Sequence, residues 1–198
     1  MKKYYVISLF VLSLLITKAV VALPQKLDID TVHSSVGFTA VHLVVAKTKG
    51  DFSNFNGSIT WDSESTKNCQ IEGLVHIDSI NTKNNKRDTH LKSKDFFYSK
   101  KYPKMTLKSS AIKQNKDGTY TLEADLSIRG VTHPIMTPLI VKGPVKGPRG
   151  KDRYGFELQF KINRHNYGLS WNKVLENGNI VVGSDVLIDV AIEAISSK

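Results

Sequence analysis

Three residues of types that often carry chemistry, Arg87, Asp88 and His90, lie within four positions of one another in the run "RDTHLKSKDFF". For acid–base or nucleophilic catalysis, His90 would need an orienting partner and a nucleophile or bound water within hydrogen-bond reach. Asp88 lies two positions before His90, and side chains at that spacing on a helix do not face each other. The neighbouring sequence supplies neither a glycine-rich oxyanion loop nor a nucleophile motif. We therefore assign no catalytic residue and expect a protein that is not an enzyme.

The same run has the spacing of a short helix followed by a loop. Leu91 follows Arg87 by four positions, and Asp95 follows Leu91 by four, as on one face of a helix. In one interpretation the helix is solvated, and only its apolar residues Leu91 and Phe96 cover a core. In the other it is a portal, where these apolar residues face a ligand tail and Arg87 and His90 face its polar head. In both interpretations the run is a lid over one end of a larger structure.

The other residues with metal-binding or redox chemistry do not form a recognisable site. The six histidines do not occur at the i, i+2 or i, i+4 spacing of a local metal pair, so no metal site is predicted. Strand parity points His42 to the interior, where a histidine is more often a hydrogen-bonded core group than a ligand. Cys69 is the only cysteine, which excludes an intrachain disulfide. It shares an inward face with Ile71 and is expected to be a buried, small apolar side chain.

Strands must position these residues, because apolar side chains recur at every second position through most of the chain. The segment 122–128 is typical, since leucine, alanine, leucine and isoleucine alternate there with glutamate, aspartate and serine. About eight segments follow this pattern, and turn residues such as Asn177-Gly178 separate them. The Gly/Pro-rich loop at 142–152 is not a domain boundary, because another strand of the same kind follows it.

Antiparallel strands with one apolar face either pack as a sandwich or close into a barrel. A closed barrel of about eight strands has an interior that side chains just fill or that holds one small ligand. The alternation alone does not distinguish these two. Large residues such as Phe38 and Phe156 share the inward face with the small Ala40 and Gly73, and small residues in an inward row leave room.

The first residues have the features of a secretory signal peptide. Lys2 and Lys3 precede an apolar run, and Val20 and Ala22 have the spacing of a signal-peptidase site. We expect residues 1–22 to be removed, leaving a periplasmic protein with a single domain at 23–198.

The domain that remains after cleavage is basic. Removing the three lysines of the leader leaves 28 − 3 = 25 basic residues against 18 acidic ones, a formal net charge of +7. This excess favours peripheral contact with an anionic membrane surface. The aromatic residues do not alternate with Lys and Arg as they do on a surface that stacks nucleic-acid bases, so no nucleic-acid partner is expected.

Six segments, in the same order along the chain, resemble one family. They are "IDTVHSSVGFTAVHL", "GDFSNFNGSI", "TKNNKRDTHLKSKDFFYSKKYP", "LSIRGVTHP", "KINRHNYGL" and "VVGSDVLIDVAIEA". With these motifs the chain resembles the YceI-like family over residues 27–195. The resemblance implies an all-β, secreted bacterial protein: an antiparallel, eight-stranded, lipocalin-like barrel with a short helix and loop as its lid. It also implies that the barrel holds a long-chain isoprenoid, such as a polyprenyl diphosphate or a quinone, or a similar amphiphilic lipid.

We therefore predict periplasmic binding, transport or sequestration of such a lipid inside a β-barrel cavity, with no cofactor or metal besides the bound lipid. Two alternatives stay open: an enzyme that acts on the lipid through His33, His42 or His90, and a filled barrel that serves as an interaction or stress protein. A homodimer is compatible with the sequence. The residues expected to contact the ligand, from strand parity and from the lid, are Val36, Phe38, Ala40, His42, Phe52, Ile71, Val75, Arg87, His90, Leu91, Phe96, Leu126, Phe156, Phe160 and Val190.

Overall fold

The structure, a computed structural model, describes residues 23–174 and 180–197, so the leader predicted at 1–22 lies outside the described residues. Ten strands, one α-helix and four short 3₁₀ helices make up the described part. Their bounds are β1 (Gln25–His42), β2 (Ala46–Phe52), β3 (Phe55–Trp61), η1 (Thr66–Asn68), β4 (Gln70–His76), η2 (Ile77–Ser79), β5 (Ile80–Asn81), α1 (Asn85–Lys92), β6 (Lys104–Gln114), β7 (Tyr120–Ile128), β8 (Val131–Lys146), η3 (Pro148–Gly150), β9 (Asp152–Asn163), η4 (Arg164–Tyr167) and β10 (Val182–Ser196). Among the described residues, no helix is long and apolar enough to cross a membrane.

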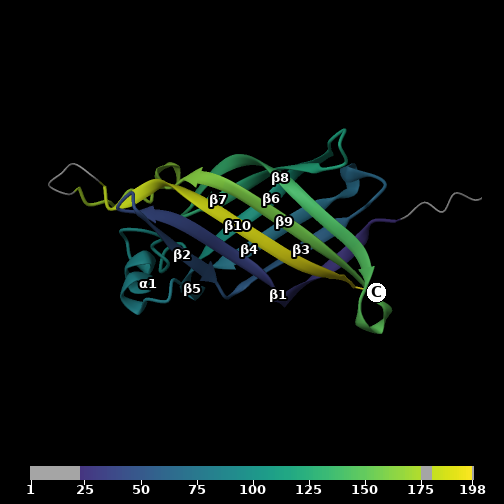
Figure 1. Cartoon of the computed structure of the whole chain (residues 1–198), viewed down its shortest axis with the longest axis horizontal. Helices are drawn as coiled ribbons and strands as arrows, with labels where there is room; N and C mark the ends of the chain where they lie inside the picture. The colour runs from purple at the N-terminus through teal and green to yellow at the C-terminus, as the bar shows by residue number, and fades with distance from the viewer. Residues whose placement is uncertain (1–22, 175–179, 198) are drawn as a thin grey trace, which may run out of the picture.

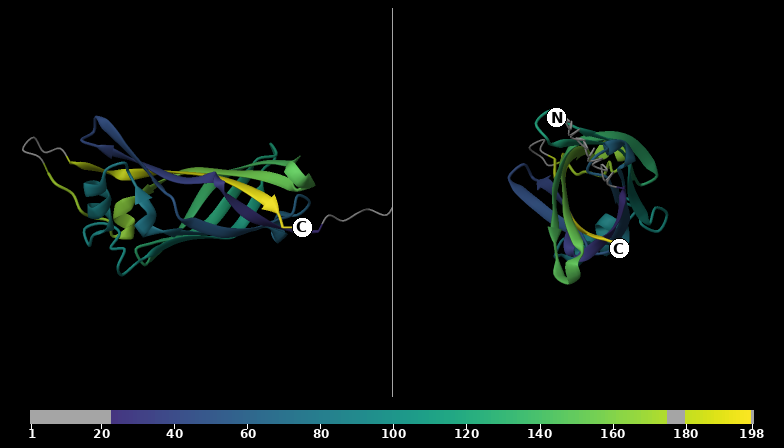
Figure 2. Two further views of the ribbon diagram at one scale, coloured as in Figure 1. Left: turned by 90° about the horizontal axis from the view of Figure 1, so that it is seen from below. Right: turned by 90° about the vertical axis from the view of Figure 1, so that its right-hand side faces the viewer.

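The strands close into a barrel because the first and the last strand of the chain pair with each other (Figure 1). Antiparallel pairing runs in the order β1, β3, β4, β6, β7, β8, β9 and β10, and β10 pairs back with β1. Strand β2 leads through a short bend into β3 and pairs with the C-terminal half of β1, while β5 follows β4 and pairs with β2. When β2 with β3 and β4 with β5 are each counted as one bent strand, the ring has eight. The predicted eight-stranded antiparallel barrel is confirmed, and a two-layer sandwich is excluded (Figure 2).

The predicted alternation of inward and outward side chains holds along the strands. On β7, Leu122 and Ala124 are 0% and 1% exposed and belong to the core. Between them, Glu123 points outward and forms an ion pair with Lys113 of the neighbouring strand β6. Cys69, just before β4, is a free and buried thiol, as predicted.

Aromatic side chains fill one end of the barrel. The Trp61 ring packs edge-on against Tyr120 and Phe156, with ring centroids 5.2 Å and 5.3 Å apart, and Tyr154 stacks on Phe156 at 6.3 Å. These four residues, which we call the aromatic floor, belong to or pack against the largest cluster of buried apolar residues. The barrel is therefore closed at this end by its own side chains.

Helix α1 and the turns after it lie at the opposite end of the barrel (Figure 1). The Asn84 side chain caps the helix by accepting a hydrogen bond from the N–H of Arg87 at 3.0 Å. The buried Asp88 carboxylate accepts hydrogen bonds from both the N–H and the hydroxyl of Thr82, at 3.0 Å and 2.5 Å. Arg87 donates to the hydroxyl and the carbonyl of Thr82, each at 2.7 Å. The predicted short helix and loop at one barrel end are confirmed. Arg87 and Asp88 bond the helix to Thr82, the residue that follows β5.

A buried arginine organises the rest of this end. Arg164, 3% exposed, donates hydrogen bonds to the carbonyls of Gly183 at 2.9 Å, Trp171 at 2.9 Å and Val182 at 3.2 Å, and also to that of Leu169. Burial lowers the pKa of the Arg164 guanidinium. Since these carbonyls belong to the segment after η4 and to the start of β10, a single side chain holds both segments in place beside α1.

Candidate functional site: an apolar cavity and its mouth

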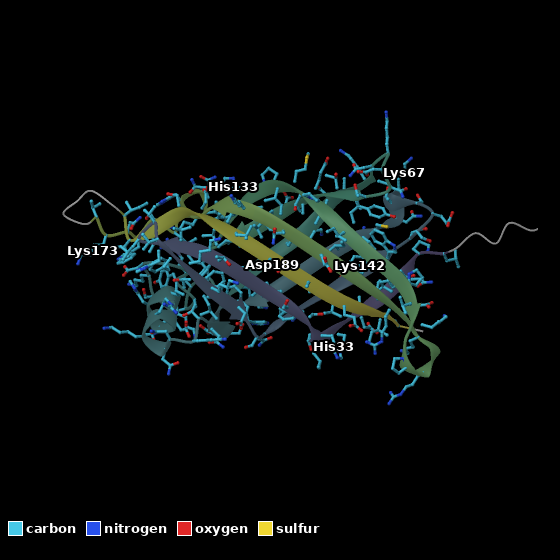
Figure 3. All side chains as sticks on the ribbon, in the orientation of Figure 1. His33, Lys67, His133, Lys142, Lys173 and Asp189 are labelled. Atoms are coloured by element: carbon cyan, nitrogen blue, oxygen red, sulfur yellow. The ribbon has the colours of Figure 1, made fainter. Side chains whose placement is uncertain are left out.

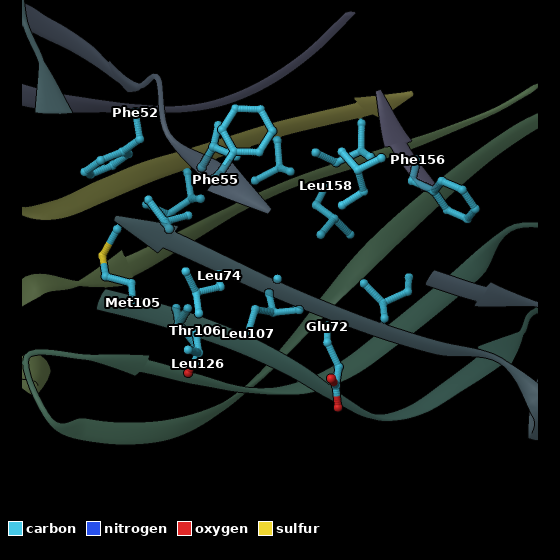
Figure 4. A pocket seen from close by; sticks show the side chains of 18 of the residues that line it. Phe52, Phe55, Glu72, Leu74, Met105, Thr106, Leu107, Leu126, Phe156 and Leu158 are labelled. Atoms are coloured by element: carbon cyan, nitrogen blue, oxygen red, sulfur yellow. The ribbon is translucent and has the colours of Figure 1, made fainter. Parts of the chain in front are cut away.

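An apolar cavity lies inside the barrel, between the aromatic floor and the end covered by α1 (Figure 4). The volume open to the centre of a water molecule is about 130 Å³. Every strand of the eight-stranded ring contributes to its wall. The side chains that line it include Ile29, Val36, Phe52, Phe55, Ile59, Ile71, Val75, Met105, Leu107, Leu126, Ile128, Leu139, Phe156, Leu158, Phe160, Ile188, Val190 and Ile192.

The register of β9 and β10 sets the depth of the cavity. Three successive inward pairs line it: Phe156 with Ile192, Leu158 with Val190, and Phe160 with Ile188. Four residue steps along a strand cover roughly 13 Å, and a strand tilt of roughly 40° reduces this to about 10 Å along the barrel axis. The cavity is therefore short and narrow.

Two facing glycines thin the wall at one point. Gly73 of β4 pairs with Gly57 of β3 and lies on the inward row between Ile71 and Val75. A Cβ atom added at Gly73 would meet no atom within 4 Å, so this position opens the wall toward the cavity. A Cβ atom at Gly57 would instead lie 2.2 Å from the backbone oxygen of Glu72, so the close approach of these strands requires glycine there.

The cavity offers no acid–base chemistry to a guest. Of the described residues that line it, Glu72 is the one with an ionisable side chain. Its side chain points away from the cavity (Figure 4). On the outer face of β4 its carboxylate forms an ion pair with Lys108 at 3.2 Å. The interior therefore favours hydrocarbon and provides neither a nucleophile nor a charged anchor.

A layer of phenylalanine rings separates this cavity from the outside at the α1 end. Phe38 and Phe52 pack with ring centroids 5.7 Å apart, and Phe52 meets Phe97 edge-on at 6.2 Å. Phe52 lines the cavity, and Phe38 lines the next hollow outward. We call Phe38, Phe52 and Phe97 the phenylalanine layer.

Beyond this layer lies a second, more polar hollow of about 240 Å³, which we call the mouth pocket. His90 Nε2 shares a hydrogen bond of 2.8 Å with the Asp95 carboxylate. The His90 ring lies edge-on to Phe96 and Trp171, with centroids 5.0 Å and 4.9 Å away. The residues that line the pocket are Phe38, Ala40, Val41, His42, Thr48, Arg87, His90, Leu91, Phe96, Trp171, Val181 and Val182. The mouth pocket thus combines apolar side chains with the guanidinium group of Arg87 and the imidazole groups of His42 and His90.

The structure divides the predicted ligand-contacting residues between these two spaces. The inner cavity takes Val36, Phe52, Ile71, Val75, Leu126, Phe156, Phe160 and Val190. The mouth pocket takes Phe38, Ala40, His42, Arg87, His90, Leu91 and Phe96. Their contact with a ligand stays a prediction. Trp171 was not among the predicted residues, because its segment has no periodicity. Leu158 and Ile188 were not among them either, although strand parity could have identified them.

A separate polar cluster lies on the outer surface, away from both spaces. Asp30 and His33 share a hydrogen bond of 2.9 Å, and Arg153 bonds the Asp30 carboxylate at 3.2 Å and also the Glu193 carboxylate. The ligand atoms of Asp30, His33 and Glu193 lie within 4.8 Å of one another. Because the Arg153 guanidinium already occupies both carboxylates with hydrogen bonds, this cluster links β1, β9 and β10 rather than fitting a metal ion.

A closed antiparallel barrel of eight strands around an apolar cavity defines a lipocalin-like β-barrel protein. The model of the YceI-like domain matches residues 27–194 of this chain. The chain therefore belongs to the YceI-like family.

Similar proteins span nearly the same length. UPF0312 protein SA2479 of Staphylococcus aureus (strain N315) is 34% identical over 165 residues, which cover 83% of this chain and 94% of that protein. The crystal structure of the Campylobacter jejuni YCEI protein matches with a TM-score of 0.69 and 29% identity, over 85% of this chain and 96% of that one. A polyisoprenoid binding domain from Saccharophagus degradans matches with a TM-score of 0.64 over 88% and 99%, and at 15% identity this likeness shows the fold alone.

Proposed function

We propose that this protein binds the apolar chain of an isoprenoid, or of a similar amphiphilic lipid, inside its barrel, and that it carries or sequesters that lipid. The observation that carries the proposal is the cavity, whose wall is apolar on all sides; none of the described residues that line it points a charged side chain inward. A polyisoprenoid binding domain with the same fold supports this ligand class.

The energetics suit such a ligand. Each methylene group moved from water into an apolar site contributes about 0.8 kcal/mol, so a five-carbon isoprene unit contributes roughly 3 kcal/mol before the cost of ordering the chain. Each further unit that is buried therefore strengthens binding without a charged anchor in the interior.

The depth of the cavity indicates where the tail and the polar head of the ligand would lie. One leaflet of a bilayer holds hydrocarbon about 15 Å deep, whereas the cavity is only about 10 Å deep. A chain longer than this must pass the phenylalanine layer and reach the mouth pocket. There Arg87, His42 and His90 line the wall, so we place the diphosphate, quinone ring or other polar head beside them.

The proposed site of action is the periplasm. The features of a cleavable signal at residues 1–22 support secretion. A protein outside the cytoplasm that encloses a lipid chain would move or store that lipid between membrane surfaces, and a homodimer is compatible with this role. Fractionation of cells that produce the full chain, with mass measurement of the mature protein, tests the location and the cleavage site.

The proposal is tested by filling the cavity at Gly73. In Gly73→Leu the new side chain projects into the space where no atom lies within 4 Å of the added Cβ, so the barrel can accept it. Binding of a fluorescent prenyl probe should weaken at least about tenfold, because the leucine displaces several methylene groups of the ligand.

Gly155→Leu is the matched control. Gly155 lies on the outer face of β9, where an added Cβ would meet only Lys142 Cβ at an ordinary 3.6 Å. This variant should bind the probe as the unchanged protein does. Native mass spectrometry of the protein purified from cells should also show a long-chain passenger that Gly73→Leu lacks. If both variants bind the probe equally well, the chain does not lie in this cavity and the proposal is wrong.

A further inference from the structure

The turn between β1 and β2 has an unusual sequence for its shape. Leu43 and Val44 have φ angles of 52° and 67°, and the N–H of Val45 bonds the carbonyl of His42 at 3.3 Å. Two central residues with positive φ are typical of a type I′ hairpin turn, which favours Asn-Gly. For valine, with its branched Cβ, this region of backbone space is an outlier.

Another turn of the same barrel also has two successive residues with positive φ angles, but its sequence is the usual one for this geometry. Between β7 and β8, Arg129 and Gly130 have φ angles of 51° and 76°, so a glycine occupies the second position. A turn needed only to connect two strands would gain stability from Asn-Gly at 43–44. Two bulky apolar residues instead occupy the most strained positions of the hairpin, which indicates that their side chains have a role outside the fold.

These side chains are part of an exposed apolar surface. Val44 and Val45 are 69% and 87% exposed, and Val174 is 66% exposed. The N–H of Leu43 bonds the carbonyl of Val181 at 3.0 Å, and Val174 forms a bridge with Ile180, so the β1–β2 turn and the segment before β10 lie side by side. We call this surface the apolar tip; it consists of Val41, Leu43, Val44, Val45, Val174 and Ile180.

The charges around the apolar tip are positive. Among the described residues of 40–50, 170–174 and 180–184, the side chains with a full charge are the exposed Lys47, Lys49 and Lys173. The sequence of the undescribed segment adds Glu176. Along β2 and β10, the first described carboxylates behind the tip are Asp51 and Asp185, which pair in register with Gly37 and Asn163 further along the barrel. Asp95 lies at the neighbouring mouth pocket, where its carboxylate bonds His90. Apolar side chains ringed by lysine are suited to the interface of a membrane with anionic lipids.

The apolar tip lies beside the mouth pocket. Val41, His42, Val181 and Val182 line the pocket and lead directly into the tip. Lys173 marks the same end of the molecule, which also carries α1, whereas Lys67 lies at the opposite end (Figures 1 and 3). A tip that inserts into a bilayer would therefore bring the mouth to the membrane surface.

We propose that the apolar tip inserts into the surface of an anionic lipid bilayer, so that the mouth of the barrel faces the membrane. This inference rests on the proposed function for its purpose, the transfer of a lipid chain between bilayer and barrel. The insertion itself is a separate physical property, because it involves a surface that does not line the inner cavity.

The first experiment reports where the protein meets the membrane. An environment-sensitive fluorophore is attached at Val45→Cys or at Val145→Cys in the mature chain; the native Cys69 is only 7% exposed. Val145 is the matched control, because it is a valine 66% exposed that pairs with Arg153 at the other end of the barrel. Vesicles of phosphatidylcholine with phosphatidylglycerol should shift the emission of the Val45 label to shorter wavelength and leave the Val145 label unchanged. Equal responses, or none at Val45, would overturn the proposal.

The second experiment separates insertion from folding. The double variant Leu43→Asn/Val44→Gly gives the turn its preferred sequence, so its melting temperature should equal or exceed that of the unchanged protein. Its binding to anionic vesicles, measured by flotation, should weaken about tenfold for each apolar side chain removed. Unchanged vesicle binding by this variant would overturn the proposal.

The same variants distinguish a failure of this inference from a failure of the proposed function. Leu43→Asn/Val44→Gly should still take up the prenyl probe from solution, since neither residue lines the cavity or the mouth pocket. Gly73→Leu should show the reverse behaviour, with vesicle binding kept and probe uptake lost. Vesicle binding by the unchanged protein without any probe uptake would support the tip and contradict the lipid cavity.

Discussion

Phe52 and Phe97 meet edge-on with ring centroids 6.2 Å apart and ring planes at 80°, and with this contact they divide the inside of the barrel in two. Phe52 comes from the end of β2, whereas Phe97 comes from the turns after α1. The lid is therefore joined to the barrel wall through the rings that cover the cavity. In the proposed binding mode, a chain that enters the cavity from the mouth pocket would displace at least one of these rings.

Removing the Phe97 ring should speed the exchange of ligand. In Phe97→Ala the probe should both enter and leave faster, while its affinity changes less than either rate, because Phe97 packs beside the cavity without lining it. Stopped-flow fluorescence measures both rates. Phe55→Ala is the control: Phe55 lines the cavity itself, so its removal should weaken binding without accelerating entry of the probe. Unchanged rates in Phe97→Ala would mean that the chain enters by another path.

Removing the centre of the aromatic floor should lengthen the cavity. Trp61 is 3% exposed, so Trp61→Ala should destabilise the protein by about 3–5 kcal/mol in urea unfolding. The space left below Phe156 should shift the preference toward longer chains, which a competition series of prenyl lengths would reveal. Trp171→Ala removes a tryptophan from the mouth instead and should leave the length preference unchanged. The same preference in both variants would show that the floor does not set the chain length.

The bond between Asp88 and Thr82 should matter for stability through its acceptor rather than its charge. Both hydrogen bonds from Thr82 go to the same oxygen, Asp88 Oδ1. Asp88→Ala leaves a buried donor without a partner and should lower the free energy of unfolding by about 1.5–3 kcal/mol. Asp88→Asn keeps an acceptor oxygen at this place and should recover most of the loss. Urea unfolding measures the free energy of unfolding of both variants. An equal decrease in Asp88→Ala and Asp88→Asn would contradict the role of Asp88 as a hydrogen-bond acceptor.

The outer cluster of Asp30, His33, Arg153 and Glu193 should make the free energy of unfolding depend on pH, through Asp30 in acid and through His33 above pH 6.5. A hydrogen bond from His33, together with Arg153, lowers the pKa of Asp30 from 3.8 to about 2, and the same bond raises the pKa of His33 above 6.5. The contribution of Asp30 is present above pH 3.8 and is lost as the pH falls toward 2. That of His33 is present below pH 6.5 and is lost as the pH rises through its folded pKa.

His33→Ala should therefore lower the melting temperature near pH 5 and have little effect near pH 9. The effect should be small, because the His33 side chain is 61% exposed. His165→Ala, which changes an exposed histidine outside the cluster, should show no such pH dependence. A constant difference between unchanged protein and His33→Ala from pH 5 to 9 would rule out this role of the pair.

The barrel could be predicted from the sequence because the inward and outward rows of a strand follow a period of two. Once a row is known, residues such as Val36, Leu126 and Phe160 must face the interior of any closed sheet. The bends after Phe52 and before Ile80 could not be predicted in this way, because they depend on pairing with strands far away in the sequence.

The polar contacts of the lid were harder to predict for the same reason. The i, i+2 spacing argued against Asp88 as a partner of His90, and the structure agrees with this; the actual partners, Thr82 for Asp88 and Asp95 for His90, were not predicted. Trp171 enters the mouth because Arg164 holds its segment by backbone carbonyls, and such contacts leave no periodic signal in the sequence.

The aromatic floor leaves the barrel blind at one end. In the proposed complex, a lipid chain that enters from the mouth pocket would therefore have a closed wall ahead of it, so the terminus that arrives first would depart last. The polar head at the other terminus of the lipid would then remain at the entrance for as long as the lipid is bound. There a partner protein could recognise or modify the head while the tail stays inside the barrel.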